Sequence, residues 1–390
     1  MRALSILIPL LALAACGPDD GAPSPVPSAT APAAVQTPAL TAIQRVTTID
    51  VTQLPNYARP DLPAHYAGNT AAIDNTPATN PIDNRTATLG RVLFYDRQLS
   101  VNGAVSCASC HQQAVGFGDS ARFSTGFSGQ AFTTAHSMRL GNVRYWQPGT
   151  MFWDRRAATL EAQASQPIIH PVEMGWDSAA GGIAALIVRL QGLDYYRELF
   201  TLAYGDQTVS EDRIQRALAQ FERAMISSDS RFDRAFAVNF RQQTPAADLP
   251  GFSAEENRGW QLFRLGPSAG GAGCGTCHTP PTFALDAASR SNGLDAGNTI
   301  DFKSPSLKNV GLAQAFMHDG RFSTLEQVVE HYNSGIQAGP ALDARLRTPG
   351  GAPLRLNLST SDKAALVAFL RTLTDETLLA DPRFASPFRQ

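Results

Sequence analysis

Two copies of one short pattern carry the clearest chemistry in this sequence of 390 residues. Each copy has two cysteines three positions apart, followed at once by a histidine. The residues are Cys107, Cys110 and His111 in the first copy, and Cys274, Cys277 and His278 in the second. Two thiols at this spacing can form thioethers with the vinyl groups of one haem, and the adjacent imidazole then lies under the iron as its proximal ligand. The pattern therefore predicts two covalently bound haem c groups.

Two other kinds of site use part of the same pattern. Cys-x-x-Cys pairs bind zinc, and they also act as redox dithiols in exported proteins. Neither kind of site explains why a histidine follows the second cysteine in both copies. Since the chain has only 5 Cys and 7 His, we favour haem at both positions.

The fifth cysteine, Cys16, follows a segment that resembles a secretory signal peptide. Residues 1–15 contain an apolar run that is too short to span a bilayer but suits the central region of such a peptide. The small residues before Cys16 resemble a bacterial lipobox, in which this cysteine becomes the lipid-bearing first residue of the mature chain. The alternative is an ordinary signal peptide that leaves Cys16 as a free thiol.

The next segment, 16–55, begins with a stretch rich in Pro, Ala, Ser and Thr. Such a composition cannot bury a core and predicts an extended linker. This linker, together with a lipid on Cys16, predicts a folded protein of the periplasm or cell envelope that is anchored to a membrane. With one cysteine used for lipid and four for haem, we expect no disulfide and no free thiol in the mature protein.

The composition excludes several broad classes of protein. With 43% hydrophobic and 17% charged residues, the chain is neither a fibre, nor a repeat array, nor a protein with many membrane spans. Its formal net charge of -2 gives no support to a strongly basic surface for nucleic acid.

Residues around the two motifs repeat along the chain, which predicts an internal duplication. The motifs are 167 residues apart, and this offset matches further identical residues: Ser137, Leu140, Asn142 and Val143 with Ser304, Leu307, Asn309 and Val310. An offset of 165 matches five more: Asp154, Arg156, Thr159, Leu160 and Glu161 with Asp319, Arg321, Thr324, Leu325 and Glu326. We therefore expect two haem domains, at 56–245 and 246–390.

Helices are expected to position both motifs. A Gly-x-x-Leu-Phe pattern precedes each motif, at 90–94 and 259–263, and predicts the N-terminal helix of a cytochrome c unit. Each half also has apolar residues spaced i, i+3, i+4, at 214–221 and 366–373, which is typical of a helix that faces a core. Strand-like alternation is scarce, so the fold is predicted to be mainly α.

The two halves differ where a second iron ligand would lie. Trp153 corresponds to His318, and fourteen residues later Pro167 corresponds to Tyr332. A tyrosine oxygen can bind ferric haem iron, whereas proline has no side-chain donor. We therefore expect an open first haem that can react with a small oxidant and a closed second haem that moves electrons.

The segment 163–173 would line the pocket over the open haem. Cleavage of a peroxide O–O bond needs a group that takes a proton from one oxygen and returns it to the other. Both Glu173 and His170 have the required chemistry, although each could instead be an ordinary surface or loop residue. Trp153 is either a core aromatic residue or an electron relay between the two haems.

These residues resemble the bacterial dihaem cytochrome c peroxidases and the related MauG enzymes, over roughly residues 80–380. The resemblance rests on both haem motifs and on MFWDxRA at 151–157, HPxEMG at 170–175 and MHDG at 317–320. It implies two cytochrome c-like domains around a pseudo-twofold axis, with a peroxidatic N-terminal haem and an electron-transferring C-terminal haem. The family's pocket glutamine, proline and catalytic glutamate then correspond to Gln163, Pro167 and Glu173, and its inter-haem tryptophan corresponds to Trp153.

The sequence also departs from the family pattern. Typical peroxidases carry a histidine that blocks the first haem until the second is reduced, but the matching region 126–130 has none, so the first haem is expected to be open in the resting enzyme. Typical peroxidases have methionine at the position of Tyr332, whereas MauG has tyrosine. The rival ligands, in order, are His331, Met317 and His318.

A calcium ion between the domains is a further property of the family. The asparagine that binds it corresponds to His136 here, and imidazole is a poor ligand for a hard cation. Carbonyls would come from around Ala313 and Ala315. The sequence therefore gives calcium only weak support.

The predicted function is that of a dihaem c-type peroxidase, which reduces hydrogen peroxide to water with electrons from a small redox protein such as a cytochrome c or cupredoxin. One alternative is a MauG-like enzyme that uses peroxide to oxidise aromatic residues of a partner protein. The other is a dihaem electron carrier without catalysis. The sequence selects neither the donor nor the oligomeric state.

Overall fold

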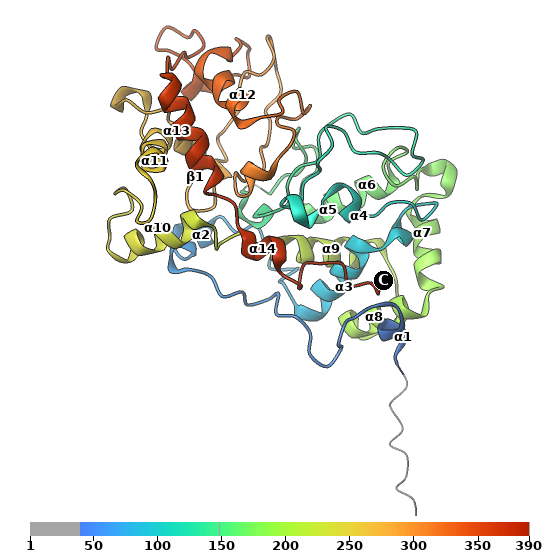
Figure 1. Cartoon of the computed structure of the whole chain (residues 1–390). Helices are drawn as coiled ribbons and strands as arrows, with labels where there is room; N and C mark the ends of the chain where they lie inside the picture. The colour runs from blue at the N-terminus through green and yellow to red at the C-terminus, as the bar shows by residue number, and fades with distance from the viewer. Residues whose placement is uncertain (1–39, 148, 390) are drawn as a thin grey trace, which may run out of the picture. The chain divides into compact units, whose positions relative to one another are not determined.

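Helices joined by long loops form most of the protein in a computed structural model, which describes residues 40–147 and 149–389 (Figure 1). The helices are α1 (Ala42–Val46), α2 (Asn69–Ala72), α3 (Asn84–Tyr95), α4 (Cys107–Cys110), α5 (Leu160–Ala164), α6 (Gln166–Ile169), α7 (Gly182–Gln191), α8 (Asp194–Tyr204), α9 (Glu211–Ala224), α10 (Arg231–Arg241), α11 (Ala254–Arg264), α12 (Leu325–Glu330), α13 (Thr360–Arg371) and α14 (Glu376–Ala380). Within the described ranges, the only strand pairing longer than a single bridge is β1 (His278–Thr279) with β2 (Ala284–Leu285), which run antiparallel. The prediction of a mainly α fold is confirmed.

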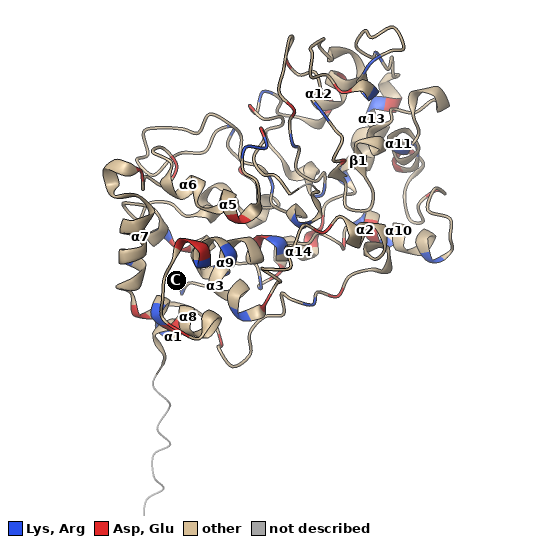
Figure 2. Ribbon diagram, turned by 180° about the vertical axis from the view of Figure 1, so that it is seen from behind, with Lys and Arg blue, Asp and Glu red and all other residues tan. Residues whose placement is uncertain are grey.

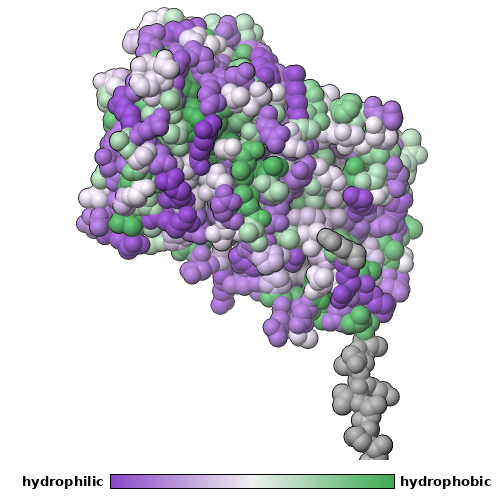
Figure 3. All heavy atoms as spheres, viewed as in Figure 1, coloured by the Kyte–Doolittle hydropathy of each residue, from purple (hydrophilic) through white to green (hydrophobic). Residues whose placement is uncertain are grey.

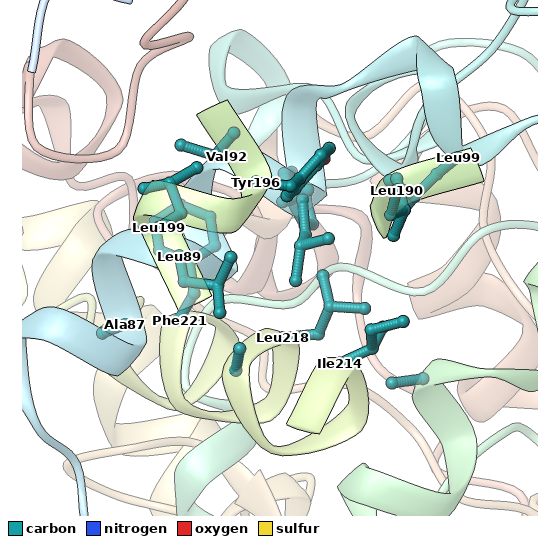
Figure 4. Close-up of a cluster of buried hydrophobic side chains, with 14 of the residues drawn as sticks. Ala87, Leu89, Val92, Leu99, Leu190, Tyr196, Leu199, Ile214, Leu218 and Phe221 are labelled. Atoms are coloured by element: carbon teal, nitrogen blue, oxygen red, sulfur yellow. The ribbon is translucent and has the colours of Figure 1, made fainter. Parts of the chain in front are cut away.

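The first large core forms where α3 packs against α9, with α8 beside them. Asp83 caps α3 by accepting hydrogen bonds from the backbone N–H groups of Arg85 and Thr86. A Cβ atom on Gly90 of α3 would lie 1.9 Å from the carbonyl oxygen of Ala217 in α9, so only glycine lets the two backbones come this close. Apolar side chains of the three helices point toward one another in Figure 4.

The second large core repeats this arrangement with α11 and α13. Ser253 and Glu256 form a reciprocal capping box at the start of α11. A Cβ atom on Gly259 would lie 2.0 Å from the carbonyl oxygen of Ala365 in α13. The helices that were predicted before each motif and at the end of each half are therefore present, and both pairs cross at a glycine.

Several loop residues with unusual backbone angles also match between the halves. Asn142 and Asn309 both have φ near +60°, at 64° and 62°. Phe152 and Met317, which correspond at the 165-residue offset, have φ of 69° and 72°. Non-glycine residues seldom adopt such angles, so the loops around the two motifs have the same local conformation.

The chain returns to the first core at its C-terminal end. Residues Leu378 and Phe384 belong to the first apolar cluster, although the preceding helix α13 belongs to the second. Figure 1 shows α14 beside α9 and α3. From Leu40 onward the chain forms one compact unit, and the boundary at 245/246 stays a prediction.

Short stretches of acidic and basic residues are scattered over the ribbon in Figure 2, and most of the ribbon is formed by other residues. The face in Figure 3 is mainly hydrophilic, with smaller groups of apolar residues between. Within the described ranges no helix is long and apolar enough to cross a membrane. The predicted signal peptide 1–15 and Cys16 lie outside the described residues, as does most of the linker 16–55.

Candidate functional site

The first motif presents His111 as a ready metal ligand. Cys107 and Cys110 begin and end α4, and His111 follows directly. His111 Nδ1 lies 3.1 Å from the carbonyl oxygen of Phe117, so this nitrogen carries the proton and Nε2 keeps its lone pair for a metal. Burial lowers the pKa of His111, which keeps the imidazole neutral as ligation requires.

The cysteines of both motifs lie in surroundings that suit thioethers better than thiolates. Burial raises the pKa of Cys110 to about 11 and that of Cys274 to about 12. Zinc needs thiolate ligands. Within 40–147 and 149–389, no three His, Cys, Asp or Glu side chains are grouped so that they could hold a metal ion. The donor set therefore fits haem better than zinc.

A cavity surrounds the second motif. It contains about 1280 Å³ of space between atoms, which includes space that is open to solvent. Its walls are mainly apolar, and it brings together residues of both halves: Trp153, Cys274, His278, Met317, His318 and Tyr332. A large flat cofactor that is held by Cys274 and His278 fits this cavity.

His278 is the proximal ligand that this cavity offers. Burial lowers the pKa of its imidazole to about 4, and the backbone of Phe283 acts in the opposite direction. Phe283 has φ of 52°, and Phe117 beside His111 has φ of 61°. The two histidines differ in one respect, since Nδ1 of His278 has no hydrogen-bond partner among the described residues whereas Nδ1 of His111 lies 3.1 Å from the Phe117 carbonyl oxygen.

Tyr332 faces the same cavity from a π-helical turn, His331–Gly335. Burial raises the pKa of Tyr332 to about 12, while a hydrogen bond from Asn292 opposes this shift. His331 does not line the cavity. Its Nε2 instead lies 3.1 Å from the carbonyl oxygen of Asn292. Of the three rival ligands, Met317 and His318 do line the cavity.

Trp153 is a cavity residue and belongs to none of the apolar core clusters among the described residues. Its Nε1 donates a hydrogen bond of 2.7 Å to the carbonyl oxygen of His136. The ring centroid of Trp153 lies 6.4 Å from that of His318, which stacks on Phe302 at 4.4 Å. This placement agrees better with a relay than with a simple core residue.

The residues expected over the first haem come from α5, α6 and the loop after α6. Gln163 lies in α5, and Pro167 lies in the first turn of α6. The backbone N–H of Met174 donates to the carbonyl of Pro167 at 3.2 Å, which folds the loop with Glu173 back onto α6. The structure therefore brings Pro167 and Glu173 together.

His170 orients this loop. Its Nδ1 accepts hydrogen bonds from the backbone N–H groups of Val172 and Glu173, at 3.2 and 3.3 Å. The same nitrogen lies 3.7 Å from Glu173 Oε1. Because its lone pair is already used, this contact is not an ion pair. The geometry favours a structural role for His170.

Glu173 has the electrostatic properties of a proton-transfer group. Burial raises the pKa of its carboxyl above the usual range, although 30% of the side chain is exposed. Burial is the main cause that raises the pKa of Cys107 and Cys110, and the charge of Glu173 adds a smaller contribution in the same direction.

The region 126–130 packs against this loop and brings no histidine to it. The backbone N–H of Phe127 donates to the carbonyls of Val172 and Glu173, at 3.2 and 3.0 Å. A Cβ atom on Gly175 would lie 2.6 Å from the Phe127 ring. No sequence pattern singled out Phe127 or Asn292.

His136 does not fit a calcium site. Its side chain is buried, and its Nδ1 lies 3.1 Å from the carbonyl oxygen of Arg122. Its backbone carbonyl already accepts the Trp153 hydrogen bond. Calcium binds oxygen ligands, and this side chain offers none.

Comparisons with known proteins relate this geometry to a family. The family model for di-haem cytochrome c peroxidase matches residues 84–240 and 264–344. MauG, a methylamine utilization protein of Methylorubrum extorquens, is 32% identical over 317 residues, which cover 77% of this chain and 81% of that protein. Cytochrome c551 peroxidase of Nitrosomonas europaea is 30% identical over 322 residues, which cover 78% of this chain and 84% of that protein.

A solved structure shares the fold over most of the chain. A MauG-like protein associated with microbial copper homeostasis superimposes with a TM-score of 0.65 and is 31% identical in sequence. The match covers 86% of this chain and 98% of that one. The similarity of this chain to that protein therefore extends over most of both chains, in sequence and in fold.

Proposed function

Because the chain belongs to the di-haem cytochrome c peroxidase family, and is a peroxidase that acts as an oxidoreductase, we propose that its two haems have separate tasks. The haem on Cys107, Cys110 and His111 reacts with hydrogen peroxide. The haem on Cys274, Cys277 and His278 receives electrons and passes them on. The observation that carries this division is the contrast between Pro167 with a nearby carboxyl in one half and Tyr332 in the other.

When bound, the first haem supplies the redox-active iron at which the peroxide O–O bond is cleaved. Glu173 would take a proton from one peroxide oxygen and return it to the oxygen that leaves as water. Burial raises the pKa of this carboxyl, which makes it a better proton acceptor than an exposed glutamate. Pro167 would offer the first haem no side-chain ligand, which would leave room for peroxide, and Gln163 would donate a hydrogen bond to that peroxide.

Electrons reach the first haem through Trp153. This ring lines the second cavity, and its N–H is held by a backbone carbonyl. A carbonyl cannot take up the indole proton, so the ring keeps its proton when it loses an electron. Tyr332 would supply a further ligand to the second haem, which would then not compete for peroxide.

The two halves arose by internal duplication and are related by a pseudo-twofold axis. The matched glycine crossings of the helix pairs and the matched φ angles support this. The domains are assigned to 56–245 and 246–390. A calcium ion is left out of the assignment because His136 offers no oxygen ligand.

The protein works in the periplasm or cell envelope, where a lipid on Cys16 holds it to a membrane. The signal-like residues 1–15 and the Pro- and Ala-rich linker support this location. Its electron donor is a small redox protein such as a cytochrome c or cupredoxin. Tyr332 also supports a second candidate function, the MauG-like oxidation of aromatic residues in a partner protein.

Peroxide consumption with and without reduced cytochrome c tests the proposed function. We expect rapid turnover with the donor, and a high-spin haem beside a low-spin haem in the ferric protein. Peroxide that is consumed only with a protein substrate would favour the MauG-like function, and two low-spin haems without turnover would favour an electron carrier.

The first prediction concerns Glu173. Replacing it with Gln removes the proton acceptor but keeps the size of the side chain, so peroxide turnover should fall by about 10²–10⁴-fold, with two haems still bound per chain. The change Glu255→Gln, at an exposed carboxylate of α11, is the matched control and should leave turnover unchanged. If Glu173→Gln keeps normal turnover, Glu173 has no part in proton transfer.

A further inference from the structure

The side-chain amide of Asn292 is fixed in one orientation beside the second cavity. Its Oδ1 accepts a hydrogen bond from the backbone N–H of Leu294 at 3.3 Å, so Nδ2 is the end that acts as a donor toward the cavity. Nδ2 lies 3.4 Å from Tyr332 Oη and 3.4 Å from Met317 Sδ. The amide nitrogen of Asn292 therefore lies beside both the phenol oxygen of Tyr332 and the thioether sulfur of Met317. Both of these atoms can bind haem iron.

The backbone holds Met317 in place. A bridge between Phe316 and Phe322 closes the turn that contains Met317, and Met317 has φ of 72°. Non-glycine residues in this region carry strain that persists only where the surrounding structure fixes them. The turn directs Met317 into the cavity that His278 and Tyr332 also line.

The first half has no ligand at either matching position. Phe152 corresponds to Met317 and has nearly the same φ, 69°. Pro167 corresponds to Tyr332. Neither Phe152 nor Pro167 has a side-chain atom that can bind iron, whereas both of their counterparts have one. The second half therefore has two side chains that can bind iron at positions where the first half has none.

We propose that Met317 is a reserve axial ligand for the haem on His278, held beside Tyr332 by Asn292. The inference rests on the proposed assignment of this haem to Cys274, Cys277 and His278. Met317 keeps the second haem six-coordinate when Tyr332 does not bind the iron. Peroxide then has access only to the first haem, whatever the state of Tyr332.

The change Tyr332→Phe in the full chain with both haems attached tests this inference. Phenylalanine removes the ligand oxygen but keeps the ring, and the contact between Asn292 and Met317 remains. We expect the second haem to stay low-spin with a thioether ligand in magnetic circular dichroism spectra. Its reduction potential should rise, because methionine ligation favours reduced iron. In the double variant Y332F/M317L the low-spin signal should be lost and the reduced haem should bind carbon monoxide.

Met138 provides a matched control, since it lines the same cavity but has no hydrogen bond from Asn292. The double variant Y332F/M138L should keep the low-spin signal of Y332F. A five-coordinate second haem in Y332F contradicts the inference. A low-spin signal that survives in Y332F/M317L also contradicts it, because another side chain such as His318 would then be the ligand.

Haem content separates this inference from the function on which it rests. One haem per chain would overturn the assignment of haem to the second motif and, with it, the reserve ligand. Two haems per chain with a five-coordinate Y332F would overturn the reserve ligand alone. Adding Asn292→Leu to Y332F tests the positioning role, and a lower low-spin fraction is expected because the amide no longer holds Met317. An unchanged fraction would show that Asn292 does not position it.

Discussion

At the residue scale, Glu222 of α9 is a buried carboxyl that the proposed reaction does not use. Only 6% of the residue is exposed, and its Oε2 has no hydrogen-bond partner among the described residues. Burial raises its pKa from 4.5 to about 8, the charge of Glu161 adds to the shift, and Arg223 opposes it. The folded protein therefore keeps this carboxyl protonated at neutral pH.

This shift predicts how stability depends on pH. Between pH 4.5 and 8 the folded state holds a proton that the unfolded state has released, so the free energy of unfolding should fall as the pH rises through this range. Below pH 4.5 both states are protonated and the dependence should vanish. Glu222→Gln should flatten the slope in urea unfolding curves measured at several pH values. An unchanged slope would place its source elsewhere, and Glu255→Gln is the exposed control.

At the element scale, one glycine sets the crossing of each main helix pair. Ala in place of Gly259 would put a methyl group 2.0 Å from the carbonyl oxygen of Ala365, so α11 and α13 would have to separate. Overpacking of this kind costs about 1–3 kcal/mol, which outweighs the gain in helix propensity of up to about 1 kcal/mol. Gly266, which has open space around it, is the control, and Gly266→Ala should leave the urea midpoint unchanged. Equal midpoints for the two variants would contradict the crossing argument.

The elements also show what the sequence could and could not predict. The helices around Gly90 and Gly259 were predictable because their apolar spacing is local. The motifs that contain His111 and His278 were predictable because haem attachment requires two cysteines and a histidine at this spacing. The contact of Asn292 with Tyr332 was not predictable, since it joins residues 40 positions apart through loops without periodicity.

At the scale of the whole molecule, the C-terminal segment completes the first core after the chain has built the second. The hydroxyls of Tyr57 and Tyr95 donate to the carbonyls of Arg383 and Phe384. The Phe384 ring is 4% exposed, and its centroid lies 6.4 Å from that of Phe117. The carbonyl of Phe117 in turn orients His111, so the end of the chain supports the proximal ligand of the first haem.

Phe384→Ala should therefore weaken the first haem site from a distance. Loss of a buried phenylalanine costs about 3–5 kcal/mol, and the cavity would lie beside Phe117. We expect a lower urea midpoint, with loss of His111 ligation, followed in the haem absorbance, at a lower urea concentration than loss of His278 ligation. Phe240→Ala, at a residue that is 42% exposed, should change the free energy of unfolding by no more than about 0.5 kcal/mol. If both ligations were lost at the same concentration in Phe384→Ala, the two cores would unfold as one unit and the local support of His111 would be wrong.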